Sequence, residues 1–266
     1  MSKYLKSCYI LTSTLVGALF TLVPETVFGC TKLFAKCSDE VNIILNRVIA
    51  AIAIFIISLL IQGIVNAARC SVTIKGKNYV IKVCYGDLFK MKKYKKIIPF
   101  DECFTTTIGT GSADINESSL CGQYLKLHPI SDIGTLLSQG GLKAKRKSKY
   151  CGLPAYEPGR KILKEDFLLM AFAKLNKDGL GELTRSEYIN CLEVMWEEIG
   201  RWHGGDSLCV PVLGSGVTNL AESQLSQQEL LDIMIHSYML VANKLKLPQK
   251  LCIVCRRKEG FSLNNI

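Results

Sequence analysis

The chain has 266 residues, which limits it to one or two domains. It carries 33 Lys and Arg against 23 Asp and Glu, and this net charge of +10 suits phosphate groups or an anionic membrane face. Twelve scattered Cys and only three His argue against a metal site, because no second Cys pair has the spacing of zinc ligands.

Two segments near the N-terminus are long and apolar enough to cross a membrane. Residues 7–24 contain no charge, and residues 46–68 contain only Arg47. A spanning helix needs about 20 mostly apolar residues, so we expect a transmembrane hairpin over residues 1–70 with these two spans. The first span is the less apolar, and a signal peptide cleaved near Cys30 is the alternative.

The flanking charges predict the orientation of this hairpin. Basic residues precede the first span and follow the second: Lys3, Lys6, Arg69, Lys75 and Lys77. Positive flanks stay on the cytoplasmic side, so we expect a multi-pass protein with both termini in the cytoplasm. Cys30 and Cys37 would face outside, where a disulfide is conceivable. Beside a membrane, the basic surface is expected to meet lipid rather than nucleic acid.

Polar residues interrupt the start of the second span. Asn42, Asn46 and Arg47 recur near helical spacing. Polar groups in lipid seek partners on neighbouring helices, so one interpretation is a packing or pore-lining face in a homo-oligomer. The alternative is that Arg47 extends to the membrane interface.

Residues 71–266 alternate between strand and helix patterns. Strand patterns, the first of them a hairpin, lie at 71–86, 97–100, 167–173, 207–213 and 251–255. Helix patterns lie at 119–127, 184–201 and 226–246. This order predicts an α/β fold, a three-layer α/β/α domain with a mixed, largely parallel sheet.

Residues 176–187 have the spacing of an EF-hand calcium loop, with Gly181 at the sixth position and Glu187 at the twelfth. However, Leu180 stands at a position where calcium needs an oxygen ligand. A calcium sensor is therefore a minor hypothesis. The alternative is a polar turn before a helix that Thr184 and Glu187 cap as a capping box.

The segment 210–218 joins a buried strand to a loop of small residues and then to a helix. Gly214 and Gly216 would let backbone N–H groups approach a phosphate closely. The loop lacks the Lys of a P-loop and the spacing of the dinucleotide fingerprint. A tight turn without a ligand is therefore the alternative.

Two segments together resemble the macro domain, a family that binds ADP-ribose and related dinucleotides. They are Val83–Phe89, which contains Gly-Asp-Leu after a strand, and Val210–Thr218. The resemblance implies that Asp87 accepts from the adenine amino group with Leu88 beside it. It also implies that a loop wraps the diphosphate through its backbone amides: Gly214, Ser215, Gly216, Val217 and Thr218.

The segment 98–106 departs from the macro-domain pattern. Hydrolytic macro domains have an Asn-rich segment there, whereas this chain has Asp101, Glu102, Thr105 and Thr106 on the distal-ribose side. The departure favours a protein that binds its ligand, with no catalytic residue, over one that hydrolyses it. A membrane-tethered ADP-ribosyl hydrolase that uses Asp101 or Glu102 is the alternative.

The whole layout resembles the transmembrane-macro effector of type II Thoeris antiphage systems. The membrane hairpin, the divergent macro-like domain and the segments Ser119–Gly122 and Glu187–Trp196 carry this resemblance. It implies a bacterial inner-membrane protein with no resident cofactor. A partner TIR protein would supply a nucleotide signal, histidine joined to ADP-ribose, and the effector would then oligomerise and disrupt the membrane to abort infection.

Overall fold

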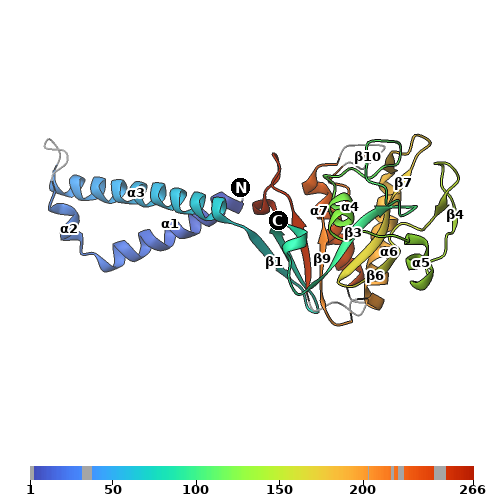
Figure 1. Cartoon of the computed structure of the whole chain (residues 1–266). Coiled ribbons are helices and arrows are strands. Elements are labelled where there is room, and N and C mark those ends of the chain that lie inside the picture. The colour runs from blue at the N-terminus through green and yellow to red at the C-terminus, as the bar shows by residue number, and fades with distance from the viewer. Residues whose placement is uncertain (1–2, 32–37, 203, 217–218, 221–224, 243–249) are drawn as a thin grey trace. The chain divides into compact units, whose positions relative to one another are not determined.

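The computed structural model describes residues 3–31, 38–202, 204–216, 219–220, 225–242 and 250–266. The chain divides into two compact units, Met1–Arg69 and Cys70–Ile266, whose ribbons are drawn in Figure 1.

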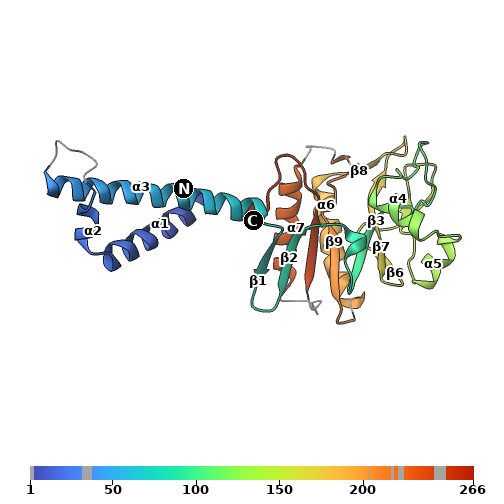
Figure 2. The ribbon, with the colours of Figure 1, turned by 60° about the vertical axis from the view of Figure 1, so that its left-hand side comes forward.

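The first unit is helical. It contains α1 (Lys3–Leu22), α2 (Glu25–Gly29) and α3 (Asp39–Ala68), and α1 lies beside α3 (Figure 2). Both long helices are apolar enough to cross a membrane, with mean hydropathies of 1.4 and 2.8, and only 6% of each apolar window is buried. A core helix of a soluble protein would be mostly buried, so the exposed apolar surface suits lipid.

Two polar residues of α3, Asn46 and Arg47, contact α2 inside this unit. The Asn46 amide donates to the carbonyl oxygen of Phe28 at 2.7 Å, and Arg47 forms an ion pair with Glu25 at 3.0 Å. The Arg47 guanidinium also lies 5.4 Å from the centre of the Phe28 ring. These contacts fix α2 against α3 within one copy of the chain. Asn42 is buried as well, and Cys37 lies outside the described residues.

The second unit is built on one mixed sheet. In the described part of the chain its nine strands run in the order β1–β2–β11–β9–β3–β7–β8–β10, with β6 beside β7. Neighbours from β2 to β7 are parallel, whereas β1, β6 and β8 pair antiparallel. The strands are β1 (Ser71–Lys75), β2 (Val80–Tyr85), β3 (Tyr94–Asp101), β6 (Lys161–Lys164), β7 (Phe167–Leu175), β8 (Gly181–Leu183), β9 (Ser207–Pro211), β10 (Asn219–Leu220) and β11 (Leu251–Cys255).

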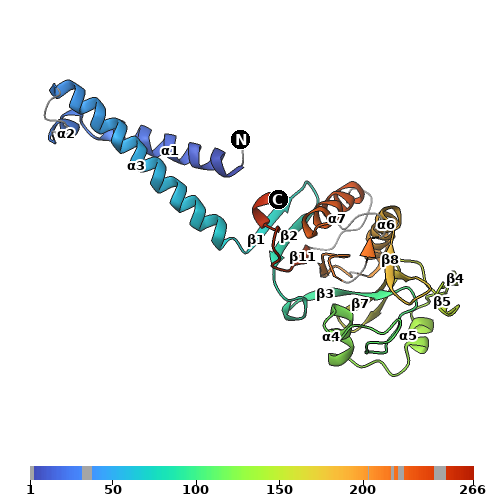
Figure 3. The ribbon, with the colours of Figure 1, turned by 90° about the horizontal axis from the view of Figure 1, so that it is seen from above.

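Helices cover both faces of this sheet. Figure 3 shows α4 (Leu120–Leu127) and α5 (Ile133–Gln139) on one face, and α6 (Arg185–Trp202) and α7 (Gln227–Val241) on the other. A separate hairpin pairs β4 (Arg146–Lys147) with β5 (Pro154–Ala155), and two short 3₁₀ turns are η1 (Leu88–Lys90) and η2 (Leu263–Asn265). The predicted three-layer domain with a largely parallel sheet is confirmed.

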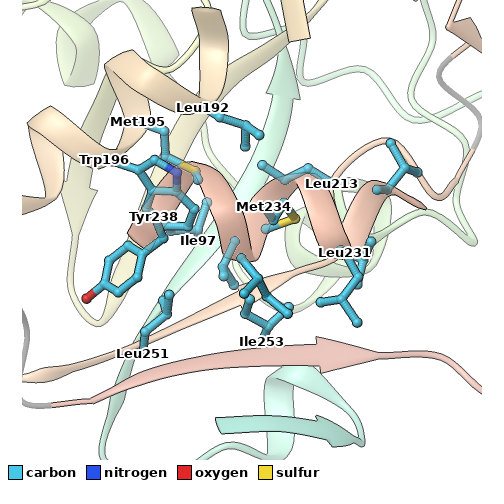
Figure 4. Close-up of a cluster of buried hydrophobic side chains, with 14 of the residues drawn as sticks. Ile97, Leu192, Met195, Trp196, Leu213, Leu231, Met234, Tyr238, Leu251 and Ile253 are labelled. Atoms are coloured by element: carbon cyan, nitrogen blue, oxygen red, sulfur yellow. The ribbon is translucent and has the colours of Figure 1, made fainter. Parts of the chain in front are cut away.

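Alternation along the strands builds a core on each face. Ile97 of β3 belongs to the cluster under α6 and α7, whereas Ile98 belongs to the cluster under α4. In Figure 4, Trp196 of α6 lies beside Tyr238 of α7, and Met234 of α7 and the strand residue Ile253 belong to the same cluster. Burying each such side chain contributes roughly 1.5–3 kcal/mol, so both helices are held to the sheet by their apolar stripes.

The structure corrects several predicted elements. The EF-hand interpretation is wrong, because Phe167–Leu175 is a strand rather than a helix, whereas the capping box of Thr184 and Glu187 is present. The strand predicted at 97–100 begins earlier, at Tyr94, where the chain pairs with β9. The helix predicted to end at residue 246 is described only to Val241, and residues 243–249 lie outside the described part.

Candidate ligand-binding site

A cavity of about 570 Å³ lies where the parallel strands end. Its walls come from the carboxyl ends of β3, β7, β9 and β11 and from the segment that follows β2. Parallel strands end at a common edge, where loops can converge on a ligand. The volume is within the usual range of about 300–1,000 Å³ for small-molecule sites.

Asp87 and Leu88 stand directly after β2, in the cavity wall. The Asp87 carboxylate accepts a hydrogen bond from the Phe89 N–H at 2.9 Å and so caps η1. Leu88 is almost fully buried in the core below α4. This turn fixes the Asp87 backbone in the cavity wall, and its expected contact with an adenine stays a prediction.

The loop after β9 forms another wall, lined by Gly214, Ser215 and Gly216. The Ser215 hydroxyl donates to the Val212 carbonyl oxygen, and the Lys258 ammonium donates to the Ser215 carbonyl oxygen, both at 2.7 Å. Described residues offer no hydrogen-bond acceptor to the N–H groups of Ser215 and Gly216. These donors are available to an anion. Val217 and Thr218 lie outside the described residues.

The N-terminus of α4 lines the same cavity through Ser118, Ser119, Leu120 and Cys121. Ser119 caps the helix by accepting from the Gly122 N–H at 3.0 Å. The first N–H groups of a helix favour negative charge. The sequence predicted this helix but no ligand role for it. Its start, Ser-Leu-Cys-Gly, could have indicated such a role, because a Ser cap and small residues leave the first N–H groups accessible.

Asp101 and Glu102 follow each other at the end of β3 but differ in role. Asp101 lines the cavity, and its carboxylate accepts from the N–H groups of Cys103 at 2.7 Å and Thr105 at 3.2 Å. Burial raises the pKa of Asp101, and these hydrogen bonds oppose the rise. The segment therefore folds back on Asp101.

Thr105 and Thr106 are not among the residues that line the cavity, and neither is Glu102. Thr105 is tied to Asp101, and Glu102 is buried with its oxygens accepting from Arg146, from the Ser148 hydroxyl and from the Leu175 N–H. The expected role of these three residues beside a distal ribose is not supported. The polar residues that line the cavity in the next segment of the chain, between residues 110 and 125, are Asp114, Asn116, Ser118, Ser119 and Gln123.

The turn between β7 and β8 forms a further part of the rim. The Asn176 side-chain oxygen accepts from the N–H groups of Asp178 and Leu180 at 2.9 and 3.0 Å. This turn presents Leu180, which is 58% exposed, at the cavity. Asn176 therefore stabilises a turn. Among the described residues, no group of three His, Cys, Asp or Glu could hold a metal ion.

Comparison with known proteins identifies the family. The family model described as "Thoeris protein ThsA, Macro domain" matches residues 81–256, about two thirds of the chain. The chain belongs to the Thoeris ThsA macro-domain family. The described residues that line the cavity, from Gly86 to Arg256, lie within the matched range, so they belong to the ThsA macro domain.

One relative and several solved structures are similar. Thoeris protein ThsA of Bacillus amyloliquefaciens (strain Y2) is 26% identical over 250 residues, covering 90% of this chain and 82% of the relative. A mutant macrodomain of Oceanobacillus iheyensis gives a TM-score of 0.49 at 10% identity, covering 74% of this chain and 95% of that chain. The same macrodomain with ADP gives 0.41 at 12% identity, covering 71% and 89%.

Proposed function

We propose that this protein is the membrane effector of a Thoeris antiphage system. Its macro domain binds an ADP-ribose-derived signal, of the histidine–ADP-ribose type, that a TIR-domain partner produces. The bound effector then oligomerises and disrupts the membrane. Membership of the ThsA macro-domain family supports the link to antiphage defence and to an ADP-ribose-related ligand.

One observation carries the proposal: two neutral anion-binding elements line a single cavity. They are the loop Gly214–Gly216 and the N-terminus of α4. Backbone N–H groups at a glycine loop and at a helix start suit a diphosphate, because they donate without a bulky side chain between them and the anion. Asp87 at the far side of the β2 turn would accept from an amino group of a base.

The hydrogen bonds of Asp101 and Glu102 favour ligand sensing over hydrolysis. The Asp101 carboxylate holds its own loop, and Glu102 holds distant segments around Arg146 and Leu175. A general base must reach the water that it activates. Glu102 does not line the cavity, and the Asp101 carboxylate, which does, already accepts hydrogen bonds from the N–H groups of its own loop.

Two features of the first unit support the proposal that the protein acts on a membrane. Its helices α1 and α3 expose their apolar surface, and α3 ends at Ala68, only three residues before β1 begins at Ser71. A ligand can shift an equilibrium in the helices only if it binds their states with different affinity. A short connection is suited to transmit such a difference, whereas a long flexible linker is not.

The proposal is tested by reconstituting the full-length protein in dye-filled liposomes and adding histidine-joined ADP-ribose. We expect dye release that depends on the ligand, together with full recovery of intact ligand by chromatography after long incubation. Intact ligand without dye release would contradict the membrane role. Conversion of the ligand into new products would support the hydrolase alternative.

A further inference from the structure

Arg256 is the one positively charged side chain among the described residues that line the cavity. Three carboxylates, those of Asp87, Asp101 and Asp114, share the lining. A diphosphate that enters this cavity brings further negative charge. Without Arg256, only neutral N–H groups would offset the repulsion between these carboxylates and the diphosphate. The positive charge of Arg256 is therefore expected to contribute strongly to binding of an anion.

The backbone around Arg256 is held firmly beside the candidate phosphate loop. The Arg256 carbonyl oxygen accepts from the Gln227 side-chain amide at 2.8 Å, and Gln227 is the first residue of α7. Two residues later, Lys258 donates to the Ser215 carbonyl oxygen at 2.7 Å. The segment 256–258 therefore bridges the start of α7 and the loop Gly214–Gly216.

The three basic side chains of this segment differ in what they contact. The Arg257 guanidinium lies 4.4 Å from the centre of the Tyr85 ring, and Lys258 is bound to Ser215. Arg256 is exposed, and within the described part of the chain its guanidinium has no hydrogen bond or ion pair. Of the three, only Arg256 both lines the cavity and has a guanidinium that forms no hydrogen bond or ion pair with another described residue.

We propose that Arg256 binds the phosphate groups of the ligand directly, through its guanidinium. The inference rests on the proposed function, because it takes the ligand to be an ADP-ribose derivative. A guanidinium presents parallel N–H donors that match two phosphate oxygens, and such charge-assisted hydrogen bonds are stronger than those from neutral amides. Arg256 thereby adds a full positive charge to a cradle otherwise made of backbone N–H groups.

The test compares neighbouring arginines in the full-length, detergent-solubilised protein by calorimetric titration. Arg256→Ala and Arg257→Ala each remove one positive charge, so their long-range electrostatic effects are matched. We expect Arg256→Ala to weaken ADP-ribose binding by roughly 10- to 100-fold. Arg257→Ala should change it by no more than about twofold, because that side chain does not line the cavity.

Adenosine, which lacks phosphate, serves as the second probe. We expect Arg256→Ala to leave adenosine affinity unchanged within about twofold, since the lost contact is to phosphate. The Arg256→Lys protein should recover part of the ADP-ribose affinity, because it keeps the charge but loses the paired donors. That partial recovery also shows that the Arg256→Ala loss does not come from misfolding.

The possible outcomes separate this inference from the proposed function. If the unmodified protein binds no ADP-ribose, the proposed function itself is overturned. If it binds and Arg256→Ala binds equally well, only the role of Arg256 is overturned. Equal loss of adenosine and ADP-ribose affinity would place the contact on the nucleoside and would also overturn the phosphate assignment.

Discussion

The backbone N–H of Tyr85 donates a hydrogen bond to the carbonyl oxygen of Cys70 at 3.1 Å. Cys70 follows Arg69, the C-cap of the candidate spanning helix α3. Tyr85 is the last residue of β2 and precedes Gly86 and Asp87 in the cavity wall. Cys70, the first residue of the second unit, is thus tied by a backbone hydrogen bond to the end of the strand that leads into the cavity wall.

This junction predicts that a flexible insertion will uncouple the two units. Four residues, Gly-Ser-Gly-Ser, placed between Arg69 and Cys70 should leave ADP-ribose affinity unchanged, because the cavity is untouched. Ligand-dependent dye release from liposomes should be lost, since a flexible chain does not transmit a small displacement. The same insertion between Lys143 and Ala144, in an exposed loop, should preserve both. Dye release that survives the junction insertion would contradict direct coupling.

A buried lysine predicts a particular dependence of stability on pH. Lys161 is fully buried and donates to the Met195 carbonyl oxygen of α6 at 2.7 Å. Burial lowers the pKa of Lys161 to about 7, although the nearby Glu198 opposes the shift. Between pH 7 and the usual lysine range the unfolded chain therefore holds more protons than the folded one. Stability from this group rises with pH across that window, by at most about 1.4 kcal/mol per unit.

Lys161→Met should therefore stabilise the protein most at pH 7 and below, and the gain should shrink as the pH approaches 10. Thermal unfolding midpoints measured from pH 6 to pH 10 check this expectation. Lys143→Met, in an exposed loop, is the control and should leave the pH dependence unchanged. A gain that is the same at every pH would argue that the ammonium charge is not the cause.

Glu102 is predicted to be a structural residue. It is buried and accepts from Arg146, the Ser148 hydroxyl and the Leu175 N–H. Glu102→Ala leaves the buried Ser148 hydroxyl and Leu175 N–H without this acceptor, while the exposed Arg146 can turn to water, and should destabilise the protein by roughly 2–4 kcal/mol, as measured by urea unfolding. Glu117→Ala removes an exposed ion pair with Lys126 and should change stability by about 1 kcal/mol or less. Equal effects of the two substitutions would contradict the role assigned to Glu102.

Patterns along single elements were enough to predict most of the fold. The continuous apolar run of β7 and the stripe of α6 are both buried as expected, including Tyr188, Leu192 and Trp196. These patterns are reliable because a buried strand or helix face consists of apolar residues at a regular spacing, which can be recognised in the sequence. Short elements such as α5 and β6 were not predicted, since they contain too few residues to show a periodic pattern of apolar positions.

Residues of the candidate site could be predicted from the sequence only where they belong to a short motif that follows a strand. Asp87 and the loop Gly214–Gly216 line one cavity, because each follows a strand that ends at the same edge. Arg256 and the α4 N-terminus were not predicted as parts of the site, since the strand order that brings them together is not the order of the sequence. Thr105 does not line the cavity, because its N–H donates to the Asp101 carboxylate and its loop folds back on that residue.

Gly216 offers the cleanest substitution for testing the cavity. A Cβ at this position would meet no atom of the described residues within 4 Å, so there is open space for a side chain to start there. By contrast, Gly214 has a φ of +77°, and a side chain there would strain the backbone. Gly216→Glu therefore places a carboxylate at the candidate phosphate loop while the fold is kept.

Calorimetric titration of the full-length protein with ADP-ribose, beside its Gly216→Glu variant, tests the central claim most directly. We predict saturable binding to the unmodified protein and no measurable binding to the variant, with equal thermal midpoints in the absence of ligand. The reason is that the new carboxylate repels the diphosphate where the free N–H groups would bind it. Equal affinity of both proteins for ADP-ribose would contradict the claim that this cavity binds the diphosphate.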